Sequence, residues 1–353
     1  MIAPPGKASD VPFGVDLTPW RRYCESNINQ KEKQMNTGLI WLGRVVGLIV
    51  ALALVGGIYE AVAEAADAKA YPPPGQLVDV GGYRLHINCT GTGGPTVVID
   101  AGLGDWSTGW AWVQTDVSQE TRVCTYDRAG YGWSDEGPLP RNAEQFAKEL
   151  HTLLHNANIP GPYVMVGHSL GGLTARVFTG MYPAEVAGVV LIDSMSPRQF
   201  KQSSGNPVAE SNLRSRPFVP FTLLAHIGLV RLLAGPLGLI PNLPSDAQKM
   251  YLAKMSRATY LQTYFGDESR GMLESRGQAE AVTSFGDLPL IVLTAKLNDM
   301  SGWQDWQTEL LQLSSNSQQL FAESGHTIEI DKPDAAVTAI LKMVERIRLS
   351  SQK

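Results

Sequence analysis

The sequence contains few cysteines and has no surplus of basic residues. Three cysteines in 353 residues are too few for a disulfide-dense scaffold or a four-cysteine zinc site. The 29 Lys and Arg residues are outnumbered by 34 Asp and Glu residues, so the chain lacks the basic footprint of a nucleic-acid-binding protein. The metal-binding pattern H-E-x-x-H is also missing. We therefore expect no metal or other cofactor and no nucleic-acid partner.

One long hydrophobic run lies near the N-terminus. Residues 39–59 read LIWLGRVVGLIVALALVGGIY and contain Arg44 as their only charge. A helix of this length spans about 31 Å, close to the hydrocarbon thickness of a bilayer. Arg44 lies near one end, where a long side chain reaches the headgroups. The run predicts a transmembrane helix over residues 39–59.

The charges on either side of this run predict its orientation. Basic residues precede it and acidic residues follow it, which places residues 1–38 in the cytoplasm as an N-terminal tail. We expect a single-pass membrane protein whose main domain is exocytoplasmic.

Two alternative interpretations of the hydrophobic run stay open: a cleaved signal peptide followed by secretion, and a buried core helix. Met35 is an alternative start. The basic residues before the run are Arg21, Arg22, Lys31 and Lys33, and the acidic residues after it are Glu60, Glu64 and Asp67.

A linker over residues 60–75 separates this helix from a larger domain. It ends in YPPPG, whose prolines favour an extended chain. Over residues 76–353, short β-branched runs alternate with helical patterns, which predicts a parallel α/β sheet with helices on both faces. From about residue 196 to 285 the alternation stops, and we expect a helical cap inserted over the sheet. The strand candidates are 84–89, 96–100, 122–126, 163–167, 188–193, 290–294 and, more weakly, 319–322.

The strongest chemical signal is Gly167-His168-Ser169-Leu170-Gly171. It follows a strand candidate directly and precedes a helical pattern, as the G-x-S-x-G motif requires. Ser169 is expected in a strained turn, where the helix N-terminus points its free N–H groups at a reacting oxygen. The alternative is a glycine-rich turn without chemistry. The motif predicts Ser169 as a nucleophile.

Two further motifs complete a resemblance to the α/β-hydrolase superfamily that covers about residue 76 to the C-terminus. Residues 127–134 (DRAGYGWS) are similar to that family's D-R-x-G-x-G-x-S loop, and Ser324-Gly325-His326 to the segment with its catalytic histidine. The resemblance implies an α/β-hydrolase fold with a mostly parallel eight-stranded sheet and a serine hydrolase activity. The most similar subgroup is bacterial, membrane-anchored and largely uncharacterised.

A serine hydroxyl needs a base that removes its proton, and His326 is the expected base. An acid must then orient the imidazole and stabilise its cation. Asp193 and Asp299 are both candidates. The family most often places its acid where Asp299 stands, displaced here by about one residue. Some families, haloalkane dehalogenases among them, place it after the sixth strand, at Asp193. We favour Asp193 and keep Asp299 as the alternative.

The oxyanion hole needs two backbone N–H donors. Leu170, directly after the nucleophile, supplies one of them. The resemblance places the second at Leu103, in a loop that reads AGLG over residues 101–104 where the family commonly has His-Gly. The missing histidine leaves the donor intact because the donor belongs to the backbone.

A serine nucleophile disfavours haloalkane dehalogenase and epoxide hydrolase activities, which require an aspartyl ester intermediate. We expect a carboxylic esterase that works through an acyl-enzyme. Acyl transfer, amide or peptide cleavage, and non-catalytic ligand binding on the same fold remain alternatives. The apolar cap favours a hydrophobic acyl ester, including a lipid ester, unless its apolar surface simply packs on the sheet. The apolar cap residues are Phe218, Phe221, Leu223, Leu224, Ile227, Leu229, Leu232 and Leu233.

Cys89 and Cys124 fall in the second and fourth strands, which are neighbours in the α/β-hydrolase order. Outside the cytoplasm, a disulfide between them is a hypothesis with a geometric basis. Two small buried thiols are the alternative. Cys24 lies before the hydrophobic run.

Overall fold

The structure, a computed structural model, describes residues 16–200 and 219–352. Part of the predicted N-terminal tail and part of the predicted cap, with Phe218, therefore lie outside the described residues. The chain divides into two units, Met1–Val55 and Gly56–Lys353, and each is described by itself.

Helix α1 (Thr18–Ala70) contains the hydrophobic run. Among the described helices it alone is long and apolar enough to cross a membrane, with a mean hydropathy of 2.3 over its most apolar stretch, of which 0% is buried. The helix continues to Ala70, so most of the segment predicted as a linker over residues 60–75 is helical, and only its YPPPG end follows the helix. Residues 61–70 (AVAEAADAKA) are rich in alanine, which has the highest helix propensity and extends the helix to the YPPPG segment.

An eight-stranded sheet forms the centre of the C-terminal unit, in the order β1-β2-β4-β3-β5-β6-β7-β8. Strand β2 pairs antiparallel with β1 and β4, and the remaining pairs are parallel. The predicted fold class, an α/β-hydrolase sheet, is confirmed. The strands are β1 (Gln76–Asp79), β2 (Arg84–Thr90), β3 (Thr96–Asp100), β4 (Val123–Tyr126), β5 (Tyr163–His168), β6 (Val186–Ile192), β7 (Leu290–Ala295) and β8 (Ser317–Ala322).

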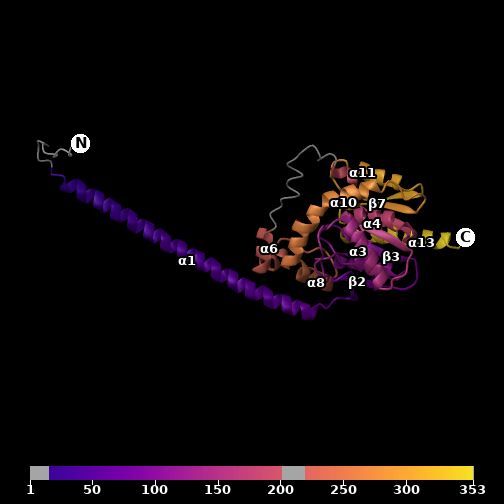
Figure 1. Cartoon of the computed structure of the whole chain (residues 1–353), viewed down its shortest axis with the longest axis horizontal. Coiled ribbons are helices and arrows are strands. Elements are labelled where there is room, and N and C mark those ends of the chain that lie inside the picture. Colours follow the sequence, from indigo (N-terminus) through magenta and orange to yellow (C-terminus); the bar gives the residue numbers. More distant parts are fainter. Residues whose placement is uncertain (1–15, 201–218, 353) are drawn as a thin grey trace, which may run out of the picture. The chain divides into compact units, whose positions relative to one another are not determined.

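Helices cover both faces of the sheet (Figure 1). Alternate residues of a strand face opposite ways, so Val98 of β3 packs with α3 (Ala143–Asn156) and α4 (Leu170–Met181). Its neighbours Val97 and Ile99 pack on the other face. The helices of that face are α2 (Ala111–Val117) and α13 (Pro333–Ser350). Strands β3, β5 and β7 are buried throughout, which explains their continuous apolar runs.

The described part of the insertion between β6 and β7 is helical, as predicted for the cap. A cluster of aromatic side chains joins it to the loops that follow β3 and β4, and the rings of Trp106 and Tyr251 stack at 4.1 Å. The inserted helices are α6 (Val219–His226), α7 (Leu229–Ala234), α8 (Ser245–Met255), α9 (Ala258–Gln262), the π-helical turn Thr263–Glu268 and α10 (Ser269–Ala281). Two short helices follow later in the chain, α11 (Trp303–Leu310) and α12 (Ile328–Asp331).

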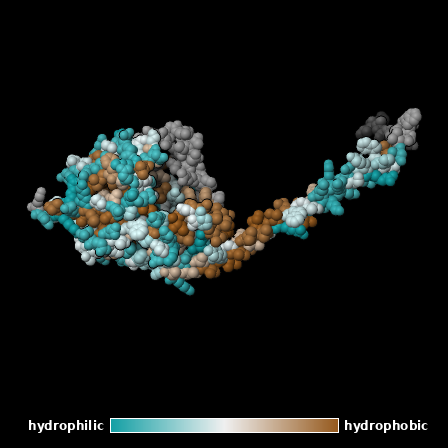
Figure 2. All heavy atoms as spheres, turned by 180° about the vertical axis from the view of Figure 1, so that it is seen from behind, coloured by the Kyte–Doolittle hydropathy of each residue, from teal (hydrophilic) through white to brown (hydrophobic). Residues whose placement is uncertain are grey.

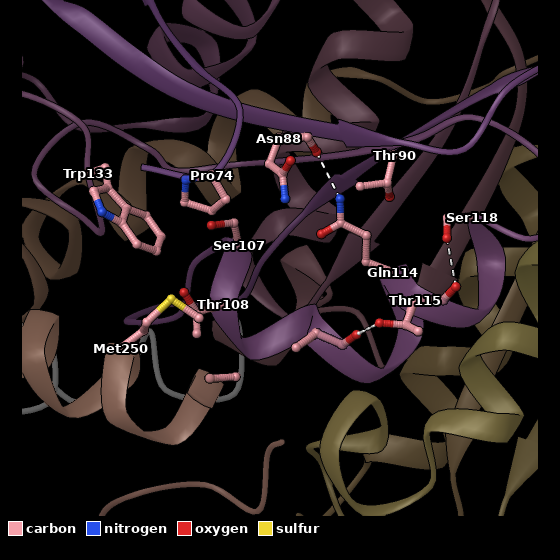
Figure 3. A pocket seen from close by; sticks show the side chains of 12 residues that line it. Pro74, Asn88, Thr90, Ser107, Thr108, Gln114, Thr115, Ser118, Trp133 and Met250 are labelled. Atoms are coloured by element: carbon pink, nitrogen blue, oxygen red, sulfur yellow. Dashed lines mark hydrogen bonds between the residues drawn. The ribbon is translucent and has the colours of Figure 1, made fainter. Parts of the chain in front are cut away.

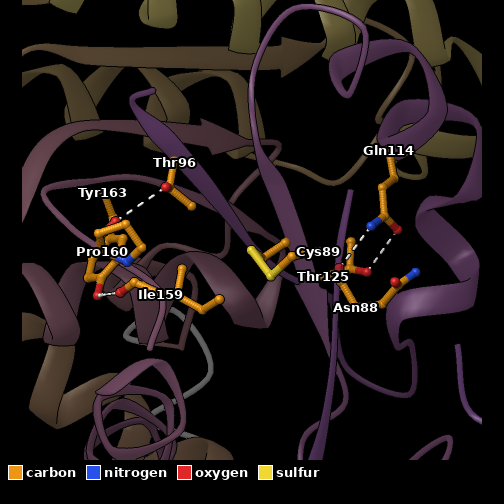
Figure 4. The surroundings of a disulfide bond; sticks show 9 residues. Asn88, Cys89, Thr96, Gln114, Thr125, Ile159, Pro160 and Tyr163 are labelled. Atoms are coloured by element: carbon orange, nitrogen blue, oxygen red, sulfur yellow. Dashed lines mark hydrogen bonds between the residues drawn. A yellow bond between two sulfur atoms is a disulfide. The ribbon is translucent and has the colours of Figure 1, made fainter. Parts of the chain in front are cut away.

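The register of β2 and β4 places Cys89 opposite Cys124, with their Cα atoms 4.0 Å apart, and the two form a disulfide (Figure 4). The disulfide hypothesis is confirmed. Beside it, the amide of Gln114 donates to the carbonyl of Asn88 and accepts from the hydroxyl of Thr125. These bonds hold α2 against the same two strands.

Candidate active site

Ser169 occupies the turn between β5 and α4. Its φ of 50° lies in the left-handed region that side chains rarely adopt, and such strain is typical of functional turns. The flanking glycines allow the turn to pack tightly. A Cβ atom on Gly167 would lie 2.5 Å from the carbonyl oxygen of Gly171, and one on Gly171 would lie 2.2 Å from that of Asp100. The strand–turn–helix geometry predicted for the motif is therefore present.

The structure brings Ser169, His326 and Asp193 together. The hydroxyl Oγ of Ser169 lies 2.9 Å from Nε2 of His326, and Nδ1 of His326 lies 2.7 Å from Oδ2 of Asp193. The three residues follow β5, β8 and β6, whose parallel arrangement brings their carboxyl ends to one edge of the sheet. This geometry permits the serine to donate its proton to the imidazole, while the carboxylate holds the opposite ring N–H.

Asp193 is completely buried and its carboxylate accepts four hydrogen bonds. Oδ2 accepts from His326 and from the amide of Asn298, and Oδ1 accepts from the indole of Trp303 and the backbone N–H of Ala295. The φ of Asp193, 39°, is also in the left-handed region. The surrounding chain thus sets both the direction and the position of this carboxylate.

The alternative acid, Asp299, is exposed, and no hydrogen bond between Asp299 and His326 occurs among the described residues. Its neighbour Asn298 reaches the site instead and donates to Asp193. Sequence reasoning missed Asn298 and Trp303, since neither forms part of a local motif.

The loop of residues 101–104 lies against the nucleophile, as an oxyanion loop must. A Cβ atom on Gly102 would lie 3.4 Å from the Cβ of Ser169. Leu103 follows directly, and Leu170 begins α4 on the other side of Ser169. The loop that contains Leu103 therefore lies beside the turn of Ser169 and Leu170.

Arg128, from the DRAGYGWS segment, holds this loop in place. Its guanidinium donates to the carbonyl oxygens of Ala101 and Gly102 at 2.7 and 2.6 Å, and to the carboxylates of Asp100 and Glu268. Burial alone would lower the pKa of the Arg128 guanidinium. The carboxylates of Glu268 and Asp100 have the larger effect and raise this pKa above its usual value. Because Glu268 belongs to the cap insertion, one side chain connects the cap with the loop beside Ser169.

His168 contacts the backbone of His326. Its Nε2 lies 3.0 Å from the backbone carbonyl oxygen of His326, and its Nδ1 lies 3.4 Å from the carboxyl of Glu329. Burial lowers the pKa of His168 to about 3, with a further contribution from the nearby His326. Burial also raises the pKa of Glu329 well above its usual range, and Asp105 adds to this shift. A neutral His168 therefore donates from Nε2, and its other ring nitrogen faces the carboxyl of Glu329.

A separate cavity of about 310 Å³ lies between β2, α2 and α8 (Figure 3). Its lining includes Asn88, Ser107, Gln114, Trp133 and Met250, and none of the residues around Ser169. Among the residues that the structure describes, no cluster of three His, Cys, Asp or Glu side chains is arranged to hold a metal ion.

Residues 95–333 match the family model for the alpha/beta hydrolase fold. The chain belongs to this family. This alpha/beta hydrolase is 27% identical over 256 residues to the uncharacterized protein YqjL of Bacillus subtilis, which covers 71% of this chain and 83% of that protein. It spans half or less of the length of several other curated relatives.

Solved structures share the fold of this alpha/beta hydrolase at lower identity. A thermophilic esterase from Thermogutta terrifontis is 21% identical with a TM-score of 0.59, over 77% of this chain and 98% of that chain. A Vigna radiata epoxide hydrolase is 15% identical with a TM-score of 0.62, over 77% of this chain and 98% of that chain. These likenesses concern the fold alone.

Proposed function

We propose that this alpha/beta hydrolase is a membrane-anchored serine esterase that cleaves hydrophobic acyl esters through an acyl-enzyme. The observation that carries the proposal is the continuous path from Ser169 through His326 to the buried Asp193, with distances of 2.9 and 2.7 Å. A nucleophile, a base and an orienting acid within hydrogen-bond reach are the minimum for acyl transfer to serine.

In the proposed reaction, His326 takes the proton of Ser169 while Oγ attacks the ester carbonyl carbon. The N–H groups of Leu170 and Leu103 stabilise the oxyanion. Asp193 stabilises the imidazolium, which then protonates the departing alcohol. A water molecule, activated by His326, attacks the acyl-enzyme, and the carboxylic acid leaves with Ser169 restored.

A serine at the elbow separates this proposal from epoxide hydrolysis, although epoxide hydrolases share the fold. An epoxide hydrolase needs a carboxylate that forms an ester with the opened epoxide. Ser169 cannot form that intermediate. The apolar cap favours a hydrophobic acyl group, and helix α1 supports a membrane anchor over residues 39–59, with the basic flank cytoplasmic and the catalytic unit outside.

Labelling with a fluorophosphonate probe tests the nucleophile. The wild-type chain should label in membranes, and Ser169→Ala should not. Esters of p-nitrophenol with butyrate, octanoate and laurate then test the acyl preference, and we expect kcat/KM to rise with chain length. Failure of the folded wild type to label or to hydrolyse any of these esters would favour the non-catalytic binding protein.

A further inference from the structure

Helices α6 and α7 form an apolar hairpin, here defined as residues 219–240. Five of the apolar cap residues named from the sequence are exposed in it instead of packing on the sheet. Brown atoms gather over this part of the C-terminal unit in Figure 2. An exposed apolar patch of this kind marks a surface that binds a membrane, another protein or a ligand. The exposed large apolar side chains are Phe221, Leu223, Leu224, Leu232, Leu233, Leu237 and Leu239.

The hairpin carries one charged side chain, Arg231, and the C-terminal end of α1 neutralises it. The Nε and Nη2 atoms of Arg231 donate to both oxygens of Glu60 at 2.9 and 2.7 Å, and Nη1 donates to Asp67 at 2.7 Å. Glu60 is 4% exposed. The guanidinium is therefore turned toward α1, the exposed apolar side chains of the hairpin carry no charge, and its other ionisable residue is the exposed His226.

The hairpin also touches the last turns of α1 through its backbone. A Cβ atom on Gly56 would lie 2.3 Å from the carbonyl oxygen of Ile227, and one on Gly228 would lie 2.9 Å from the ring of Tyr59. Two glycines thus permit an approach that larger residues would block. Gly56 and Tyr59 are among the last residues of the predicted membrane span, and Glu60 is the first residue after it.

We propose that the α6–α7 hairpin inserts its apolar face into the acyl-chain and headgroup boundary of the lipid leaflet in which the α1 span ends. The proposal rests on the membrane anchor proposed above. A helix that leaves the bilayer at Glu60 holds the hairpin at the height of the membrane surface, because the two contact each other at Gly56 and Tyr59. An uncharged face rich in leucine and phenylalanine suits that boundary.

The hairpin is connected with the oxyanion loop. The ring of Phe221 stacks on Phe265 at 4.8 Å, and Phe265 contacts the neighbouring ring of Tyr264 at 4.5 Å. A Cβ atom on Gly104 would lie 2.8 Å from the Tyr264 ring. Lipid seated on the hairpin is therefore separated from the loop beside Ser169 by three aromatic rings.

Lipid quenching in the full-length protein tests the insertion. In a Cys24→Ser background that retains the Cys89–Cys124 disulfide, single cysteines are introduced as Leu232→Cys, Leu52→Cys or Leu349→Cys and labelled with an environment-sensitive fluorophore. Each protein is reconstituted in phosphatidylcholine vesicles with or without doxyl-labelled phosphatidylcholine. Leu349, exposed on α13, is the matched control outside the hairpin.

We expect the doxyl lipid to quench the probes at positions 52 and 232 and to leave the probe at 349 unchanged. Quenching at 52 but not at 232 would overturn the hairpin proposal while leaving the anchor intact. This includes the case of a blue-shifted, unquenched probe at 232, which indicates cover by a second copy. Absence of quenching at 52 would overturn the anchor, and the hairpin proposal with it. None of these readouts depends on esterase activity.

An activity comparison gives the second arm. We expect Leu232→Asp to lower hydrolysis of a fluorogenic long-chain ester embedded in the vesicles by about tenfold, because a carboxylate opposes seating of the hairpin. Hydrolysis of a water-soluble butyrate ester should stay unchanged, as should both rates in Leu349→Asp. Equal loss on both esters, or no loss on either, would contradict the proposal.

Discussion

The Nε2 atom of His168 lies 3.0 Å from the backbone carbonyl oxygen of His326, so the residue before Ser169 supports the segment that carries His326. The ring centroids of the two histidines are 4.8 Å apart. A neutral imidazole at His168 supplies the N–H for this bond without placing a second positive charge beside the imidazolium that forms at His326.

This contact predicts a positioning role for His168. We expect His168→Ala to lower kcat by about tenfold to a hundredfold with little change in KM, because the loss of one buried hydrogen bond lets the His326 segment relax. His168→Gln retains an N–H donor at a similar reach and should recover most of the rate. Steady-state kinetics on a soluble ester measure both variants. Equal losses in the two would indicate a packing role instead.

The two candidate acids predict opposite outcomes. Asp193→Asn should lower the rate of fluorophosphonate labelling by up to about 10⁴, because an amide cannot stabilise the imidazolium of His326. Asp299→Asn should change it by less than about twofold, since Asp299 is exposed and, among the described residues, makes no hydrogen bond to His326. Labelling time courses on membranes compare the variants with the wild type. Comparable losses at both positions would contradict the assignment of Asp193.

The Arg231 pairs predict a contribution to stability that an exposed pair does not make. Arg231→Met leaves the buried Glu60 carboxylate unpaired, and we expect it to cost about 2–4 kcal/mol and to lower the Tm by several degrees. Arg198→Met, which removes an exposed pair with Glu309, should cost less than about 1 kcal/mol. Thermal unfolding in one detergent tests both. A cost at Arg198 as large as that at Arg231 would show that burial is not the reason.

The buried carboxyl of Asp105 predicts a pH-dependent stability. Burial raises its pKa to about 7, with a further contribution from Asp127. Between its unfolded pKa of about 3.9 and about 7, the folded state binds the extra proton, so stability falls as pH rises through this window. Asp105→Asn removes the free-energy cost of ionising this buried carboxyl. Relative to wild type it should gain about 2–3 kcal/mol in unfolding free energy between pH 5 and pH 8.

Denaturant unfolding at the two pH values measures this gain, and Asp246→Asn is the matched control because Asp246 is exposed. A difference between Asp105→Asn and wild type that is the same at pH 5 and pH 8 would show that Asp105 is already ionised at pH 5 or never ionises in this range.

Much of the fold was predicted from patterns within short stretches of the sequence. The strand–turn–helix context of Ser169 lies within one short stretch of chain, so neighbouring residues sufficed to identify the elbow. The buried strands were visible because each is a continuous apolar run. Strand β1 was missed, since its sequence, QLVD, has two exposed and two half-buried residues and no such pattern. The end of α1 was also misplaced, because the apolar run ends before the helix does.

The sequence by itself determined the alpha/beta hydrolase fold and the apolar character of the cap, and it predicted Ser169 as the nucleophile and His326 as the base. Only the tertiary structure showed which of Asp193 and Asp299 contacts His326, because β6 and β7 are parallel neighbours and both residues lie at the same edge of the sheet. The decision came from side chains distant in sequence, above all Trp303 and Asn298, which hold Asp193 against His326. The tertiary structure also showed that leucines of the α6–α7 hairpin are exposed. The composition of a segment indicates that it is apolar, but not which of its side chains are buried against other residues.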